Sequence, residues 1–378
     1  TACTVALPHG LHDVDAPTRV AGALDAIPLD GDAGPGGTGV LAAGALPFDA
    51  DTPTALLVPR LLVSWHPRAA ATWLTLVHKE HEAADPLASA AELAVAGDVG
   101  SNRLLSRTAQ PSDEAFLDAL KSCVERLRRG ELQKAVLARF VSGQCRDPID
   151  AAAVAATLHR LDPACDLYAY PDGPGRVVGA SPELVVATAD GAVSAHPLAG
   201  TVRLGAGVDD EAQVAWLLAS AKNRAEHAVV VDDIVARLGP LCEALHAASS
   251  PSVVRLSTNA RLGTWVDGKL LGRRDAATAF AVLAALHPTP AVGGVPRRSA
   301  LAVIRELEAA PRGPWAGPVG WVDADGTSTW TLALRSVRIH GDRFTVWGGA
   351  GIVAASEPDD ELEEITEKLA SVLRVLEA

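Results

Sequence analysis

The stretch Ser112–Val141, SDEAFLDALKSCVERLRRGELQKAVLARFV, joins two elements of different kinds with little chain between them. Across Phe116–Leu127 its apolar residues recur at the spacing of one helix face. Ser112 is a favoured N-cap residue, and Gly130 follows the last turn. The mostly apolar run Lys134–Val141 is typical of a buried strand. The stretch therefore predicts a helix that leads almost directly into a strand.

Patterns elsewhere in the chain mix helices and strands. Further strands are expected at Arg176–Val178, Leu184–Thr188, Val253–Leu256, Trp330–Ile339 and Arg343–Val346. Further helices are expected near 209–238, 275–286, 297–309 and 357–377. Because the two kinds do not alternate in strict βαβ repeats, the sequence favours an α+β fold over a doubly wound sheet.

The composition is that of a large globular chain. It has 378 residues, of which 48% are hydrophobic, enough to bury a sizeable core. The formal net charge of -13 argues against a general nucleic-acid or anionic-membrane surface, because binding phosphate needs a positive field. The longest nearly apolar run, 276–286, is too short to cross a bilayer. The 5 cysteines contain no CxxC pair, so a reducing cytoplasm is expected rather than a disulfide framework.

Three short motifs fail on physical grounds. Residues 34–39 match GxGxxG but lie in a Gly/Pro loop rather than between a strand and a helix. Residues 263–270 resemble a phosphate loop, yet Leu270 stands where Ser or Thr must bind magnesium. Residues 179–183 resemble a nucleophile elbow, but Pro182 lacks the N–H that an oxyanion hole needs. Dinucleotide binding, nucleotide hydrolysis and serine hydrolysis are therefore disfavoured.

Several other segments form a pattern in order along the chain. They are Lys134–Arg139, Gly179–Leu184, His196–Thr201, Lys222–His227, Leu286–Gly294, Ala316–Trp321, Gly349–Val353 and Glu361–Lys368. Together they resemble the chorismate-utilising enzymes, the family of anthranilate, aminodeoxychorismate, isochorismate and salicylate synthases. The resemblance implies two large β-sheets packed together with helices on the outside. It also implies one large domain over residues 1–378, in which 1–105 form a lobe without catalytic motifs and 110–378 form the catalytic core.

The resemblance implies a pair of residues for acid and base chemistry. Lys134 would be the base and Glu183 the acid. Adding water at one ring carbon while another carbon loses a hydroxyl needs both, since hydroxide is a poor leaving group. A lysine base and a glutamate acid each need a cleft that tunes their ionisation. The alternative is that Lys134 is a solvated lysine at a strand edge and that Glu183 caps a turn.

Chorismate carries two carboxylates, so its site also needs positive charge. Magnesium that is held by one or two carboxylates, with substrate and water as its other ligands, meets this need. The resemblance implies Glu226 and Glu364 as the ligands, with Glu361 in reserve. On the helix expected at 357–377, Glu361, Glu364 and Lys368 share one stripe beside the apolar stripe. The same stripe is equally typical of a solvated helix face on which Glu364 and Lys368 form a pair.

Six residues are expected, by the same resemblance, to contact the substrate. They are Gly200, Thr201, Ala291, Arg335, Gly349 and Lys368. The fixed fork of an arginine suits bidentate binding of a carboxylate, and glycines let the backbone approach a ligand. The alternative for Arg335 is an outward position in the alternating run Trp330–Ile339.

Two positions indicate a branch of the family. Members that add ammonia usually have glutamine at the position of Lys134, so lysine resembles the members that use water. Members with lyase activity commonly have threonine at the position of Ala291, so alanine resembles the branch that stops at isochorismate. The expected activity is that of a magnesium-dependent isomerase, an isochorismate synthase in menaquinone or siderophore biosynthesis. The alternatives are a salicylate synthase, which also eliminates pyruvate, and a non-catalytic chorismate-binding protein. A monomer without nucleic-acid or membrane partners is expected.

Overall fold

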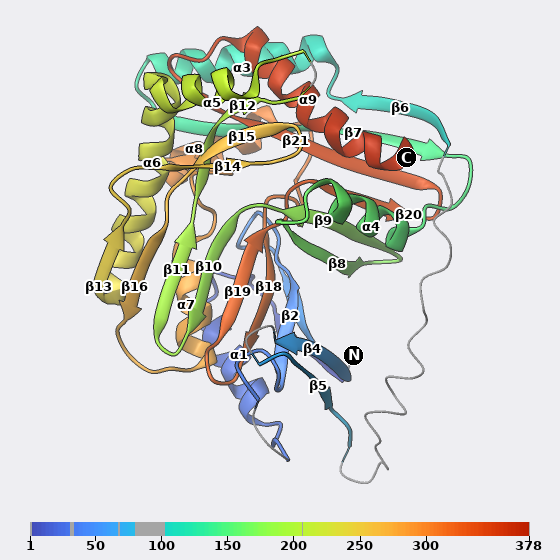
Figure 1. The fold of residues 1–378 in the computed structure, drawn as a ribbon, viewed down its shortest axis with the longest axis vertical. Coiled ribbons are helices and arrows are strands. Elements are labelled where there is room, and N and C mark those ends of the chain that lie inside the picture. Colours follow the sequence, from blue (N-terminus) through green and yellow to red (C-terminus); the bar gives the residue numbers. More distant parts are fainter. Residues whose placement is uncertain (1, 31–33, 67–68, 80–102, 206, 378) are drawn as a thin grey trace.

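Two large sheets form the centre of the protein, and helices lie on their outer sides (Figure 1). The computed structural model describes residues 2–30, 34–66, 69–79, 103–205 and 207–377. Neighbouring strands in both sheets run antiparallel, as an α+β fold without βαβ units requires. The α+β prediction is therefore confirmed.

The first large sheet has nine strands in the described part of the chain. Their order is β1 (Cys3–Leu7), β3 (Thr54–Val58), β2 (Leu41–Ala45), β18 (Pro318–Asp323), β19 (Ser328–Leu332), β10 (Leu184–Ala189), β11 (Ala192–His196), β16 (Val266–Leu270) and β13 (Cys242–Ala247). Strands from the expected N-terminal lobe thus share a sheet with strands of the expected catalytic core. Residues 80–102 of that lobe lie outside the described residues, and the division into lobe and core stays a prediction.

The second large sheet has β7 and β21 at its centre. Its order is β17 (Gly294–Val295), β7 (Lys134–Cys145), β21 (Arg343–Val353), β20 (Ser336–His340), β9 (Gly175–Ser181) and β8 (Asp166–Asp172), with β6 (Leu104–Gln110) also paired to β7. Two smaller sheets consist of β12 (Leu198–Arg203), β15 (Asn259–Gly263) and β14 (Ser252–Arg255), and of β4 (Leu61–His66) and β5 (Ala71–Leu76). β7 and β21 pair along eleven residues, from Lys134 opposite Val353 to Gln144 opposite Arg343.

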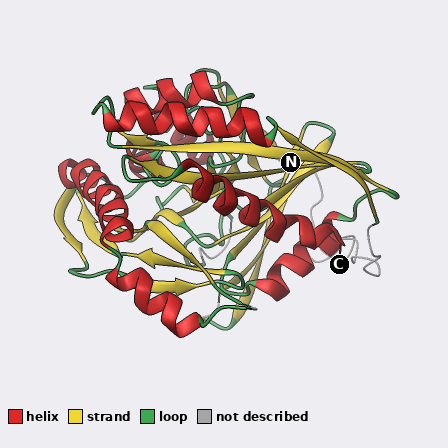
Figure 2. Cartoon of the chain, turned by 90° about the horizontal axis from the view of Figure 1, so that it is seen from above, coloured by secondary structure: helices red, strands yellow, loops and turns green. Residues whose placement is uncertain are grey.

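The helices cover the sheets from outside, and Figure 2 shows them lying across and around the strands. They are α1 (Ala16–Asp25), α3 (Asp113–Arg128), α4 (Ala151–Leu161), α5 (Asp210–Ala219), α6 (Ala221–Leu238), α7 (Ala276–Leu286), α8 (Arg297–Leu307) and α9 (Pro358–Glu377), with a 3-10 turn at Gly239–Leu241. α3 and α9 pack on β7 and β21, α4 packs on β8 and β9, and α7 packs on β10, β18 and β19. Each large sheet therefore buries a face against helices.

One continuous hydrophobic core joins these layers. It extends from Val5 on β1 through Leu137 on β7 to Leu376 on α9. The N-terminal strands and the C-terminal helix are therefore packed into the same interior.

All five cysteines are free, as expected. No helix in the described ranges combines the length and the apolar character needed to span a membrane.

The helix and strand expected from Ser112–Val141 both form. The Ser112 hydroxyl accepts a hydrogen bond from the N–H of Ala115 at 3.3 Å and so caps α3. The strand β7 begins at Lys134 as expected and continues to Cys145. The local signals in this stretch were sufficient to predict both elements, because the N-cap residue, the apolar helix face and the apolar strand run all indicate the same structure.

The single strand expected at Trp330–Ile339 is wrong. β19 ends at Leu332 and belongs to the first large sheet, whereas β20 begins at Ser336 and belongs to the second. Arg335 between them has a φ of 48°, in the left-handed region that a strand cannot contain. The alternating apolar residues are Trp330, Leu332 and Leu334 before the break and Val337 and Ile339 after it. The alternation therefore changes phase at the break, a signal that the prediction of one strand overlooked.

The continuous helix expected near 209–238 is also wrong. Ser220 has an extended backbone (φ -64°, ψ 113°) that ends α5, and its hydroxyl accepts a hydrogen bond from the N–H of Asn223 to begin α6. Periodicity alone predicts one helix, but Ser220 caps a new helix and so separates α5 from α6.

The buried contacts of Arg312 test how much one polar network contributes to the stability of the fold. Its guanidinium is buried and donates to the carbonyls of Val136 and Val292, both at 2.7 Å, and to the carboxylate of Glu308. Arg312→Met should lower the free energy of unfolding by about 3–5 kcal/mol, because Glu308 is left buried without its partner. Urea denaturation measures this loss.

The matched control is Arg305→Met, which breaks an exposed pair with Asp49. Its expected cost is about 1 kcal/mol or less. Equal losses for the two variants would contradict the structural role of Arg312.

Candidate active site

The expected base, Lys134, is a buried lysine with a carboxylate partner. It begins β7, is 1% exposed, and its backbone pairs with Val353 on one side and Val295 on the other. Its Nζ lies 3.0 Å from Oε1 of Glu226 on α6. A Cβ at position Gly351 would lie 2.5 Å from the same oxygen, so only glycine leaves room for this pair. Lys134 is thus not a solvated lysine at a strand edge.

The expected acid, Glu183, lies in the short connection between β9 and β10 and is 3% exposed. Its N–H donates to Ser181 Oγ at 3.3 Å, and its carbonyl accepts from the N–H of Leu332 at 3.0 Å. Burial raises the pKa of the Glu183 carboxyl to about 7, although the Arg261 guanidinium opposes this shift. A carboxyl with this pKa keeps a proton near neutral pH, as a general acid must.

Both residues line one pocket of about 210 Å³, to which the second large sheet, the β12–β15–β14 sheet and helices α5, α6 and α9 contribute residues. Nine of the ten residues expected at the site line this pocket: Lys134, Glu183, Gly200, Thr201, Glu226, Ala291, Gly349, Glu364 and Lys368. Gly200 has a φ of 74° at an irregularity in the pairing of β12 with β15, a conformation that favours glycine. The structure therefore gathers residues from distant segments into one small space.

Arg335 is the exception. Its Nη1 lies 2.7 Å from Asp162 Oδ2, and its Nη2 lies 3.3 Å from Asn259 Oδ1. It lines a small adjoining cavity of about 50 Å³, which shares Gly349 and Lys368 with the main pocket. Its guanidinium is therefore held beside the pocket rather than in it, and its contact with a substrate carboxylate stays a prediction.

Three carboxylates of the pocket act on the ammonium of Lys222. Lys222 Nζ lies 3.1 Å from Glu361 Oε1. Burial alone would lower the pKa of Lys222, but the charge and hydrogen bond of Glu361 raise it above its usual value. Glu226 and Glu364 add to this shift. The cluster therefore already stabilises one cation.

The same carboxylates suit a hard divalent cation, because Mg²⁺ prefers oxygen ligands and needs only one or two from the protein. Burial raises the pKa of Glu361, and the neighbouring charge of Glu364 raises it further. Burial also opposes ionisation of Glu364, but its 2.6 Å pair with Lys368 outweighs this effect and lowers its pKa. Within the described ranges, no three His, Cys, Asp or Glu side chains are close enough to hold a metal ion. A metal here would therefore also need ligands from water and substrate.

Helix α9 has both stripes that its sequence predicted. Ile365 and Leu369 are buried in the core, and Glu361 is buried beside them. Glu364 and Lys368 form the predicted pair between successive turns, and both also line the pocket. The sequence left open whether Glu364 and Lys368 form a pair on the helix face or belong to the site. In the structure they do both.

Two cationic residues of the pocket were missed. Lys222 lies inside a recognised segment but received no role. Arg261 lies in no recognised segment, and it is at the middle of the short strand β15, where it pairs across the sheet with Thr201. Its only signal in the sequence is a positive charge in a short strand whose other four residues are buried.

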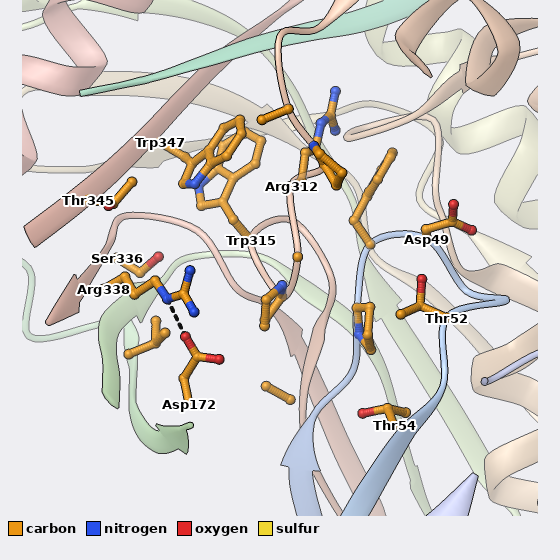
Figure 3. A pocket seen from close by; sticks show the side chains of 18 of the residues that line it. Asp49, Thr52, Thr54, Asp172, Arg312, Trp315, Ser336, Arg338, Thr345 and Trp347 are labelled. Atoms are coloured by element: carbon orange, nitrogen blue, oxygen red, sulfur yellow. Dashed lines mark ion pairs between the residues drawn. The ribbon is translucent and has the colours of Figure 1, made fainter. Parts of the chain in front are cut away.

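A larger cleft of about 1290 Å³ lies beside the pocket, and Trp315 lines both. Figure 3 shows Trp315 next to Trp347, and their stacked rings have centroids 5.8 Å apart. Arg338, which lines the same cleft, forms an ion pair with Asp172. None of the ten expected site residues lines the larger cleft, so we assign the chemistry to the smaller pocket.

The fold and the pocket together define a class of protein. A protonated carboxyl, a buried lysine and a cluster of carboxylates around a small cavity form an enzyme site for a polar anionic substrate. Residues 36–374 match the family of chorismate binding enzymes. The chain belongs to this family.

Individual relatives agree with this membership. The MenF protein of Mycobacterium tuberculosis (strain ATCC 25618 / H37Rv) is 37% identical over 354 residues, which cover 90% of this chain and 87% of that protein. The DhbC structure from Bacillus anthracis gives a TM-score of 0.81 at 28% identity, over 99% of this chain and 91% of that chain. The structure of MenF from Escherichia coli, a menaquinone-specific isochorismate synthase, gives a TM-score of 0.76 at 29% identity, over 89% and 79%. The two-sheet fold implied by the resemblance is confirmed.

The raised pKa of Glu183 predicts a dependence of stability on pH. Between the unfolded value of 4.5 and the folded value of about 7, the folded protein binds the proton more tightly, so stability falls as pH rises through this window. Glu183→Gln removes this loss and should stabilise the protein near pH 8 by up to about 3 kcal/mol, but only slightly near pH 5. Urea denaturation at the two pH values measures the difference.

Glu243→Gln is the control, because Glu243 pairs with Lys269 on the surface. It should have the same small effect at both pH values. A Glu183→Gln variant that behaves like this control would show that Glu183 ionises normally.

Proposed function

We propose that this chain converts chorismate to isochorismate. The observation that carries the proposal is one pocket with a buried lysine and a buried carboxyl whose pKa is about 7. Adding water at one ring carbon and removing a hydroxyl from another requires a base and an acid at the same time. The name of the Escherichia coli relative supports the same reaction.

In the proposed mechanism, Lys134 acts on water and Glu183 acts on the leaving group. The unprotonated amine of Lys134 takes a proton from water, and the water oxygen bonds to the ring carbon. Both double bonds of the ring diene shift by one position, and the bond from another ring carbon to its hydroxyl breaks. Glu183 gives its proton to that hydroxyl, which leaves as water. One water enters and one leaves, so the reaction is an isomerisation.

The Lys134–Glu226 ion pair sets a condition on this mechanism. A base must be uncharged when it accepts the proton from water, so the proton shared in this pair must leave before the attack. The ring carbon that is attacked must also come within reach of Nζ, which the glycine at position 351 permits on the side of β21. Lys134 must therefore lose a proton within the pocket before it can accept one from the attacking water.

Magnesium is proposed as the cofactor. Glu226 and Glu364 would hold it, with Glu361 beside them, and the ion would supply positive charge for a substrate carboxylate. The support is the cluster of three carboxylates that already stabilises the Lys222 ammonium. Glu226 also pairs with Lys134, so the proposed metal site and the base share one carboxylate.

Ala291 supports a reaction that stops at isochorismate. It lines the pocket, where members of the family with lyase activity commonly have threonine. The salicylate synthase alternative would add elimination of pyruvate at the same site. The non-catalytic alternative is disfavoured because the acid, the base and the proposed metal ligands are all present. A cytoplasmic monomer, in menaquinone or siderophore biosynthesis, remains the proposed setting.

Product analysis tests the proposed reaction. Incubation with chorismate and Mg²⁺ should yield isochorismate without pyruvate, measured by chromatography and a coupled pyruvate assay. Salicylate with an equal amount of pyruvate would contradict the assignment in favour of the lyase. Tight chorismate binding without any product would favour the non-catalytic alternative.

Variants at the acid and the base test their roles. Lys134→Ala and Glu183→Gln should each lower kcat by roughly 10²–10⁴-fold, as expected for general acid–base groups. Lys269→Ala and Glu243→Gln, which alter an exposed pair outside the pocket, should retain full turnover. Turnover at the wild-type rate in Lys134→Ala would refute the mechanism.

Glu364→Gln tests the proposed metal site. The variant should need a higher Mg²⁺ concentration for half-maximal activity and should bind Mg²⁺ more weakly in calorimetry, because one anionic ligand is lost. Glu367→Gln is the control, since Glu367 is on the same helix but pairs with Arg203 and does not line the pocket. Equal Mg²⁺ affinity in both variants would contradict the assignment of Glu364.

A further inference from the structure

One large apolar side chain borders the polar pocket and yet faces solvent. Trp216 on α5 lines the pocket together with Lys222 and Glu361, and it is 56% exposed. Of the large hydrophobic residues that are exposed in the described part of the chain, it is the only one that lines this pocket. An aromatic ring in this position offers a ligand a favourable contact, because covering the ring removes apolar area from water.

Trp216 lies at the outer end of the pocket. The expected base and acid, Lys134 and Glu183, are almost fully buried. The side chains of Lys222 and Glu364 are 39% and 34% exposed, although both residues line the same pocket. The lining therefore extends from a buried floor at the acid and the base to an open rim, which consists of Lys222, Glu364 and Trp216.

The break between α5 and α6 brings Trp216 to this rim. On one continuous helix the side chains of residues 216 and 222, six positions apart, would point in directions about 120° apart. Ser220 instead ends α5 with an extended backbone, and its N–H donates to the carbonyl of Trp216 at 2.8 Å. With α6 starting in a new direction, Trp216 and Lys222 line the same pocket. The turn at Ser220 thus places an aromatic ring beside the charged residues of the rim.

A small hydrophobic core holds α5 in this position. Val214 and Leu217 of this helix are buried against Val202 on β12 and Leu262 on β15. This core is separate from the main core that joins the two large sheets. Trp216 belongs to neither core within the described ranges. Its ring is therefore fixed near the rim by its helix but is not needed to fill the interior.

The shape of the substrate indicates what this ring contacts. The carboxylates and hydroxyl of chorismate suit the charged lining of the pocket, but its six-membered ring has an apolar face on each side. Val136, Leu198 and Val292 are buried apolar residues that line the pocket and can pack on one face. The other face then points toward the rim, where Trp216 is the only apolar side chain.

On the basis of the proposed function, we infer that Trp216 packs on the ring of bound chorismate and covers the outer end of the pocket. The contact buries an indole ring that is exposed in the free protein, and so it adds affinity for the substrate. Trp216 takes no part in the proton transfers, which belong to Lys134 and Glu183. The open rim of the pocket is thus completed by the substrate itself.

Acrylamide quenching of tryptophan fluorescence tests the contact directly. Acrylamide quenches exposed rings more strongly than buried ones, and Trp315, which also lines the pocket, is already buried. Saturating chorismate with Mg²⁺ should lower the quenching constant of the wild type. The pocket stays occupied after the reaction reaches equilibrium, because substrate and product share the site. Calorimetry under the same conditions confirms that the ligand is bound.

Two conservative variants assign the protection to one residue. It should be absent from Trp216→Phe and should persist in Trp265→Phe. Trp265 is the matched control, because it is also exposed but packs on His196 and does not line the pocket. Both replacements keep an aromatic ring, so the fold and the site should remain intact.

Steady-state kinetics provides an independent measurement. Trp216→Ala should raise KM for chorismate by roughly tenfold, as expected when a ligand loses contact with an aromatic side chain. Its kcat should stay within about threefold of the wild type, because the contact is the same in the ground state and the transition state. Trp265→Ala should match the wild type in both values.

Each result decides the inference. An unchanged quenching constant in the wild type with bound chorismate would overturn it, and so would equal protection in Trp216→Phe. A raised KM in Trp216→Ala without protection in the wild type would also overturn it, because Trp216 would then only support the fold. Chromatography of the product judges the proposed function separately. Protection of Trp216 without isochorismate would refute the reaction and keep the contact, whereas a protein that does not bind chorismate would contradict both.

Discussion

The pairing of buried charges is the constraint on which this active site depends. Ions removed from water are costly unless each has a close partner, and the buried groups Lys134 and Glu361 meet this condition through ion pairs with Glu226 and Lys222. Two further groups of the pocket lie outside these pairs. The raised pKa of Glu183 favours its uncharged form, which suits an acid, and the Nε of Arg261 is buried without a hydrogen-bond partner among the described residues.

The fold supplies these charges from rigid elements that are distant in sequence. Lys134 begins the longest strand of the second sheet, Glu183 lies where the chain passes from that sheet to the first, and Lys222 and Glu226 belong to α6. Glu361, Glu364 and Lys368 project from α9, which packs on β21. Groups held by packed helices and paired strands keep their positions, as catalysis by a small acid–base pair requires.

Much of this site could be predicted because its residues lie in short segments that resemble those of the chorismate-utilising enzymes. The stripe on α9 needed only helical periodicity, and Lys134 was already at the start of a predicted strand. The crossover at Arg335 was missed because both flanking runs are rich in strand-forming residues, although the alternation of apolar residues changes phase there. Arg261 could not be predicted either, because a lone arginine in a short strand gives no local sign that the assembled sheets place it at the pocket.

The most direct test of the account is the origin of the new hydroxyl oxygen. The mechanism adds a solvent water and expels the original hydroxyl, so turnover in water labelled with oxygen-18 should give isochorismate with one labelled oxygen per molecule. Mass spectrometry of the product at low conversion measures this label, and recovered chorismate serves as the reference. Isochorismate without label would contradict the account, because the hydroxyl would then have moved within the substrate and Lys134 would have no water to activate.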